Sequence, residues 1–211
     1  MKPSNLNKRD LLLLTKLIKE IKKLPGVVCI VQIGSSTYSK SYKDIDLIIF
    51  FNDIPPPELK EIRNRYKKNK FWIERAHVNK YKISRGINFF IKFFNHLNTK
   101  KILYGKNPYE DKKIALTKLD VASYIGYNYQ ISELYGLSYD NVLSTSLNAM
   151  LTYKNVFPKN KEETLKLFKE TYPKLFKFLP KNPDYYLRKT NESNFKELYQ
   201  FFSESLKFFS K

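Results

Sequence analysis

The sequence predicts an α/β (α+β) protein, with a short mixed sheet flanked by helices in the N-terminal part and a helical bundle after it. Three observations lead to this prediction. Short β-branched runs alternate with amphipathic helical patterns up to about residue 110. Beyond residue 111, strand patterns fade and helical spacing dominates. The 211 residues are enough for two small domains, which we place at 1–110 and 111–211.

The first half alternates helices and strands. Leucines and isoleucines recur at helical spacing after residue 9, and Pro25-Gly26 ends that pattern. The segment 83–98 fits a helix by spacing, but its phenylalanines and isoleucines equally fit a strand. The other expected elements are a helix over 9–24, strands over 27–33 and 45–51, a helix from 58 to about 69, a strand over 71–78, and a short strand with a turn over 100–110.

The second half predicts four helices. Gly136 is placed to end the first of them, and Asn160 with Glu163 forms a plausible capping box for the third. The predicted helices cover 114–136 and 140–156, a segment after Asn160, and a segment that begins at Asn191 or Ser193. Their apolar spacing is that of a bundle core.

The net charge of +19, with lysines spread along the whole chain, favours polyanionic partners such as nucleic acid. The alternative is a lysine-rich surface that is simply solvated. The apolar runs are too short to span a bilayer, and the first one is an amphipathic helix rather than a signal peptide. A single cysteine, Cys29, excludes an internal disulfide and is expected to be a buried, inert thiol. We therefore expect a cytoplasmic protein with no membrane partner.

The stretch V-V-C-I-V-Q-I-G-S-S, followed by K-D-I-D-L-I-I-F-F, carries the functional pattern. Asp44 and Asp46 are one residue apart at the start of a strand, so their side chains project to the same face. Carboxylates this close repel unless a cation lies between them, and hard oxygen ligands suit Mg²⁺ or Mn²⁺. Gly34, Ser35 and Ser36 form a turn whose N–H groups and hydroxyls suit phosphate oxygens. Solvated aspartates and an ordinary turn are the alternatives.

The combined pattern resembles the DNA polymerase beta-like nucleotidyltransferase superfamily, in particular its small members with a C-terminal helical domain. The resemblance rests on I-G-S at 33–35, D-I-D-L at 44–47 and L-Y-G-K-N-P at 103–108. It implies that Asp44 and Asp46 hold the metal ions and that Gly34 and Ser35 contact the nucleotide triphosphate, with help from Ser36. The sequence departs from the family pattern at Lys43, where a serine is usual.

The family places a third carboxylate on a neighbouring strand, where it binds metal and takes the proton of the attacking hydroxyl. Glu74, in F-W-I-E-R-A-H-V, is the only acid between Glu61 and Glu110, so it is the candidate. The alternative is a surface residue paired with Arg75 or Lys82.

The resemblance implies a magnesium-dependent enzyme that transfers a nucleoside monophosphate from an NTP to an acceptor hydroxyl and releases pyrophosphate. The net charge favours RNA, including tRNA, as the acceptor over a basic antibiotic, although a small molecule or a protein stays open. The alternatives are a catalytically silent module that binds nucleic acid or a protein, and an antitoxin-type enzyme that modifies a partner protein.

Overall fold

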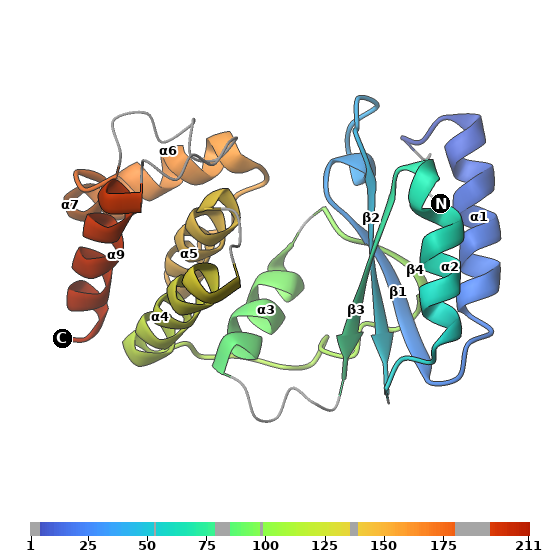
Figure 1. The fold of residues 1–211 in the computed structure, drawn as a ribbon, viewed down its shortest axis with the longest axis horizontal. Coiled ribbons are helices and arrows are strands. Elements are labelled where there is room, and N and C mark those ends of the chain that lie inside the picture. The colour runs from blue at the N-terminus through green and yellow to red at the C-terminus, as the bar shows by residue number, and fades with distance from the viewer. Residues whose placement is uncertain (1–4, 53, 79–84, 98, 136–138, 180–194) are drawn as a thin grey trace. The chain divides into compact units, whose positions relative to one another are not determined.

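A computed structural model describes residues 5–52, 54–78, 85–97, 99–135, 139–179 and 195–211. The chain forms two compact units, coloured along the sequence in Figure 1. The first contains Met1–Ser84 and Leu97–Asp111, and the second contains Arg85–His96 and Lys112–Lys211. The sheet belongs to the first unit, and the second is helical.

The sheet has four strands in the order β3-β2-β1-β4. β1 is antiparallel to both β2 and β4, whereas β2 and β3 are parallel, so the sheet is mixed. The parallel pair needs a crossover connection, which α2 (Glu58–Tyr66) provides. The strand bounds are β1 Val27–Ile33, β2 Ile45–Phe51, β3 Phe71–His77 and β4 Lys101–Gly105.

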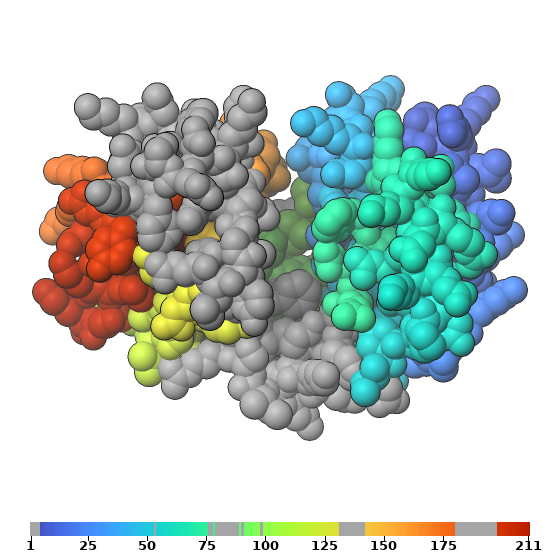
Figure 2. All heavy atoms as spheres, viewed as in Figure 1, coloured from blue at the N-terminus to red at the C-terminus, as the bar shows by residue number. Residues whose placement is uncertain are grey.

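Two helices, α1 (Lys8–Ile21) and α2, cover one face of this sheet (Figure 1). Alternate residues of β2, from Ile45 to Phe51, are buried with the apolar residues of both helices in one core cluster. The outer side of α2 lies at the molecular surface, drawn in teal in Figure 2. Because side chains alternate along a strand, the other residues of β2, including Asp46, point to the face away from the helices.

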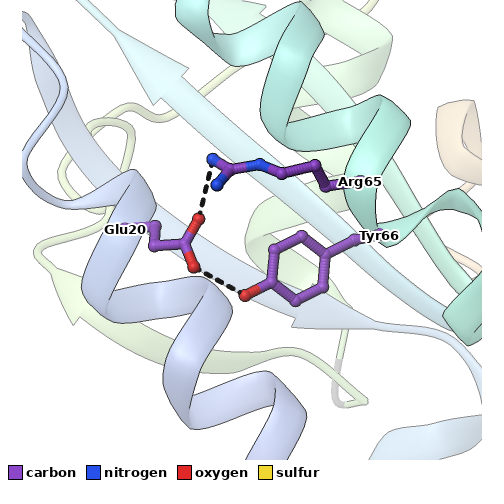
Figure 3. A network of polar contacts seen from close by, with 3 residues as sticks. All are labelled: Glu20, Arg65 and Tyr66. Carbon is purple, nitrogen blue, oxygen red and sulfur yellow. Dashed lines mark hydrogen bonds and ion pairs between the residues drawn. The ribbon is translucent and has the colours of Figure 1, made fainter.

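A polar network also joins α1 to α2 (Figure 3). Glu20 accepts a hydrogen bond of 2.8 Å from the hydroxyl of Tyr66, and its other oxygen lies 3.0 Å from a guanidinium nitrogen of Arg65. Burial and the bond to Glu20 raise the pKa of the Tyr66 hydroxyl to about 12. The network therefore contains a neutral tyrosine and a paired carboxylate at the solvent edge of the core.

The helical unit contains α3 (Arg85–His96), α4 (Lys118–Tyr135), α5 (Tyr139–Tyr153), α6 (Lys161–Thr171), α7 (Pro173–Phe176) and α9 (Phe195–Phe209). Phe89 of α3 and Phe168 of α6 belong to the same core cluster. Phe89 stacks at a tilt on Tyr124 of α4, with ring centroids 5.0 Å apart. The helix-or-strand ambiguity predicted for 83–98 is resolved in favour of a helix over Arg85–His96.

The predicted fold class is confirmed, and so is the buried Cys29, whose pKa burial raises to about 11. Asn160 caps α6 by accepting from the N–H of Glu163, as expected. The predicted helix start at 191–193 lies outside the described residues. The division at 110/111 stays a prediction, because α3 groups with the helical unit while the segment after it returns to the sheet.

Gly105 explains why L-Y-G stands at the end of β4. Its φ is +71°, and a Cβ there would lie 1.9 Å from the carbonyl oxygen of Val28 in β1. Only glycine allows this approach of β4 to the central strand. Within the parts of the chain that the structure describes, no helix is long and apolar enough to cross a membrane.

Candidate active site

The turn after β1 places the backbone of Gly34 close to the carboxylate of Asp46. Gly34 has φ +76° and begins the 3-10 helix η1 (Ser35–Thr37). A Cβ at Gly34 would lie 2.4 Å from Oδ2 of Asp46, on the neighbouring strand β2. The glycine is therefore required for two reasons, a left-handed backbone conformation and the lack of space for a side chain.

The serines of the turn have different environments. Ser36 is only 1% exposed, and its hydroxyl accepts a 3.0 Å hydrogen bond from the side-chain amide of Gln32. Ser35 is half-buried, and its carbonyl accepts from the N–H groups of Tyr38 and Ser39. The buried hydroxyl of Ser36 thus stabilises the turn through its bond to Gln32, whereas Ser35 is partly accessible. The contacts predicted between these serines and a nucleotide stay predictions.

Two carboxylates share one face of the sheet, and a third immediately precedes β2. Ile45 and Leu47 face the helices, so Asp46 points to the opposite face. In β3, Ile73 also faces the helices, so Glu74 shares the face of Asp46. Asp44 immediately precedes β2 and is exposed. In the parallel register, Asp46 lies opposite Trp72, and Glu74 lies two residues further along β3 on the same face.

Among these three carboxylates, Asp46 is the one whose pKa is shifted by the other two. Its pKa is raised to about 6, first by burial and then by the negative charges of Asp44 and Glu74. The shift shows that Asp46 is within electrostatic reach of both other acids. A bound cation would offset both the cost of burying the negative charge of Asp46 and its repulsion by the other two carboxylates. This is the behaviour expected of a metal-ligating carboxylate.

Glu74 has a partner that the sequence did not suggest. The indole N–H of Trp72 donates a 2.6 Å hydrogen bond to Oε1 of Glu74. Residues i and i+2 of a strand lie on the same side, so the W-x-E spacing was an available signal. The bond fixes one oxygen of an exposed carboxylate and does not engage the other. The alternative of a pair with Arg75 is absent from the ion pairs of the described residues, and Lys82 lies outside them.

The loop between η1 and β2 is tied to the N-terminal segment by polar side chains. Tyr42 donates a 2.7 Å hydrogen bond to Oδ2 of Asp10, which is only 7% exposed. The Asn5 amide donates to the carbonyl of Thr37 at 2.8 Å. Sequence reasoning missed these residues, because 32 positions separate the partners of each bond. They hold the loop that precedes Asp44.

The donor set fits a divalent cation in part. Among the described residues, no three His, Cys, Asp or Glu side chains gather closely enough to form a complete metal site. Asp44 and Asp46 supply hard oxygen ligands, and the raised pKa of Asp46 favours a cation beside it. Magnesium commonly binds through one or two carboxylates together with substrate phosphates. The residues present are therefore compatible with a metal ion whose coordination is completed by the phosphates of a nucleotide.

Comparison with known proteins finds a similar fold. No family model matches the chain, and no curated protein matches it. Among solved structures, the chain is similar to spectinomycin adenyltransferase AAD(9) from Enterococcus faecialis, solved with ATP and spectinomycin. The two share 13% sequence identity, with a TM-score of 0.53 over 93% of this chain and 99% of the other. The mixed sheet with flanking helices and a following helical part is thus a fold that this chain shares with that adenyltransferase.

Proposed function

We propose that this protein is a nucleotidyltransferase that uses Mg²⁺ or Mn²⁺ to transfer a nucleoside monophosphate from an NTP to an acceptor hydroxyl. The observation that carries the proposal is the position of Asp46, which lies against the Gly34 turn and within electrostatic reach of Asp44 and Glu74. The similar fold of an adenyltransferase solved with ATP supports it.

Each residue has a distinct role in the proposed reaction. Asp44 and Asp46 would hold the metal, which supplies charge neutralisation at the phosphates when bound. Gly34 and Ser35 would position the triphosphate. The acceptor oxygen forms a bond to the α-phosphorus, the bond from that phosphorus to the bridging oxygen breaks, and pyrophosphate leaves. Glu74 would accept the proton of the acceptor hydroxyl through the oxygen that Trp72 does not engage.

We favour RNA, including tRNA, as the acceptor. The net charge of +19 attracts a polyanion and repels a basic small molecule. Spectinomycin in the similar structure is a ligand of that protein. A protein hydroxyl is the other acceptor to test, since an antitoxin-type enzyme would label a partner protein or itself.

The test is incubation of the purified protein with each α-³²P-labelled NTP, Mg²⁺ or Mn²⁺, and total RNA. Label is then measured on RNA and on protein separately. We expect label on RNA with a preferred NTP and none with Asp46→Ala. Label on protein alone would replace the RNA acceptor with a protein acceptor. No label on either, with NTP binding intact, would contradict transfer to macromolecules and leave either a small-molecule acceptor or a catalytically silent module.

Glu74→Gln tests the third carboxylate separately. The amide can still accept the hydrogen bond from Trp72, but it is a much poorer base and metal ligand. We expect loss of turnover of about 10²-fold or more, with NTP affinity nearly retained. Unchanged turnover would return Glu74 to the role of an exposed strand residue.

A further inference from the structure

Trp72 is a large exposed side chain on the face of the sheet that carries Asp46. Its neighbours in β3, Phe71 and Ile73, are buried in the core beneath α1 and α2, so the indole points to the opposite face. In the parallel register, Trp72 lies opposite Asp46. Trp72 is 59% exposed, although tryptophan is highly buried on average. The candidate active site therefore includes an open aromatic surface beside the carboxylate that we propose as a metal ligand.

The hydrogen bond from Trp72 to Glu74 links this surface to the proposed base. The indole N–H donates to Oε1 of Glu74 at 2.6 Å. The N–H is at the edge of the ring, so the bond occupies neither ring face. In the proposed reaction, an acceptor whose hydroxyl reaches the other oxygen of Glu74 therefore lies next to the indole.

The order of the strands separates the two substrates of the proposed reaction. The strand that carries Asp46, β2, lies between β1 and β3. The Gly34 turn, proposed for the triphosphate, follows β1, whereas Trp72 and Glu74 belong to β3. With the triphosphate toward β1 and the acceptor hydroxyl toward β3, the indole is on the acceptor side of Asp46.

We infer that Trp72 binds the terminal nucleoside of a nucleic-acid acceptor, with the base stacked on the indole and a ribose hydroxyl directed to the oxygen of Glu74 that Trp72 does not engage. The inference rests on the proposed function and specifies its acceptor as the end of a strand. A nucleoside suits this site because it combines a flat ring and a hydroxyl in one unit, and every base offers a π-face to an aromatic side chain.

A tyrosine of a protein substrate is the competing occupant, because it also combines a flat ring with a hydroxyl. It lacks the phosphates that precede a terminal nucleoside, and a chain with a net charge of +19 attracts those phosphates. The charge therefore favours nucleic acid, and a comparison of strands with and without a terminal base tests the choice.

The experiment uses the fluorescence of Trp72, which is the only tryptophan in the chain and so reports on this position alone. Two single strands of equal charge are titrated without NTP or metal. Both consist of abasic ribose phosphates and carry a 3′-hydroxyl, but one ends in adenosine and the other in a further abasic ribose. We expect the strand that ends in adenosine to quench the emission and to bind about fivefold or more tightly than the abasic strand.

Substitution of Trp72 tests the same contact through the anisotropy of a fluorescein label at the 5′ end. Trp72→Ala should weaken binding of the adenosine-ended strand about fivefold or more and leave the abasic strand unaffected. Trp72→Phe should retain most of the affinity, because it keeps an aromatic ring while it removes the bond to Glu74.

Leu12→Ala is the matched control for these substitutions. It removes an apolar side chain that is 72% exposed on α1, across the sheet from the indole, and should change neither affinity. Thermal unfolding by circular dichroism shows whether the variants are folded. If Trp72→Ala does not fold, the two strands on the wild-type protein decide the outcome.

Equal affinity and equal quenching for the two strands would overturn the inference, since binding would then follow charge alone. Displacement of the adenosine-ended strand by N-acetyltyrosinamide, with no loss of the abasic strand, would assign the indole to a tyrosine acceptor and overturn it too. Competitive displacement by α,β-methylene-ATP, which cannot be cleaved at the bond that transfer breaks, would assign the indole to the base of the NTP.

Failure of this inference is distinguishable from failure of the proposed function. Label on RNA that does not depend on Trp72 would overturn the inference alone. Stacking of the terminal base without any nucleotide transfer would contradict the proposed function and leave Trp72 as a nucleoside-binding residue.

Discussion

Asp46 occupies the space that any side chain at residue 34 would need, with Oδ2 of Asp46 only 2.4 Å from the Cβ position of Gly34. Gly34→Ala must therefore displace the carboxylate and also adopt φ +76°. We expect a loss of about 1–3 kcal/mol in the free energy of unfolding, measured with urea, and loss of nucleotide transfer. Both effects share one cause, the shift of Asp46 away from the turn.

Gly126→Ala is the matched control for that prediction. Gly126 lies inside α4, and the nearest heavy atom to its added Cβ would be Cδ2 of Leu206 at 3.9 Å, an ordinary contact. Alanine in a helix is favoured over glycine by about 1 kcal/mol, so this variant should gain stability. If Gly34→Ala were equally well tolerated, the close approach of the turn to Asp46 would be wrong.

Asp46→Asn should stabilise the protein at neutral pH while it abolishes transfer. The folded-state pKa of about 6 lies above the ordinary value of 3.8, so the folded state binds this proton more tightly. The contribution to stability is therefore full below about pH 3.8 and is lost as the pH rises through about 6. Above that pH we expect Asp46→Asn to gain about 1–2 kcal/mol, after allowance for solvent screening.

The measurement is urea unfolding of Asp46→Asn and wild type at pH 4, 6 and 8. Asp111→Asn, at an exposed site, is the control and should stay within about 0.5 kcal/mol of wild type. A gain from Asp46→Asn that is the same at pH 4 and pH 8 would contradict the origin of the effect in a raised pKa.

The same titration predicts how activity depends on pH. A protonated Asp46 is a poor ligand for a cation, because the proton and the metal compete for the carboxylate. We expect kcat/KM of the proposed transfer to fall as the pH is lowered through about 6. Higher Mg²⁺ should shift this midpoint to lower pH, and a midpoint that ignores Mg²⁺ would separate Asp46 from metal binding.

Tyr42→Phe tests the tie between the loop and α1. The change removes the hydroxyl that donates to the buried carboxylate of Asp10 at 2.7 Å. We expect a loss of about 1–2 kcal/mol in the free energy of unfolding and a raised KM for the NTP, because the loop leads to Asp44. Tyr38→Phe is the control, since Tyr38 lies in the same segment, is 48% exposed and should change neither quantity. Equal effects of both substitutions would count against the tie.

Tyr66→Phe and Arg65→Gln separate the two contacts of Glu20 (Figure 3). Tyr66 is buried, so loss of its 2.8 Å bond leaves a partly buried carboxylate less well paired, and we expect a cost of about 1–2 kcal/mol. Arg65 is 62% exposed, so its ion pair is worth about 0–1 kcal/mol. Urea unfolding should rank the two in that order, and the reverse order would show that the ion pair dominates.

Local patterns predict most of the fold because each depends on a few neighbouring residues. Alternation along β2 is enough to place Asp46 on the face away from the buried Ile45 and Leu47. The cap of α6 is likewise predictable from its local sequence, because Asn160 accepts from the N–H of Glu163 only three residues away. The segment 83–98 is ambiguous by sequence, since its strand-forming residues also fit one helical face. Over Arg85–His96 the structure has a helix, and Phe89 of this helix packs into the helical core.

The two aspartates, the glycine turn and a lone acid on the third strand can all be identified from the order of residues in the chain. Which of them interact depends on the folded arrangement. The parallel register of β2 and β3 brings Glu74 within electrostatic reach of Asp46. Long-range hydrogen bonds from Tyr42 to Asp10 and from Asn5 to Thr37 hold the segment before Asp44. Strand alternation is a local property of the backbone, whereas register and side-chain pairing depend on which distant segments share a core.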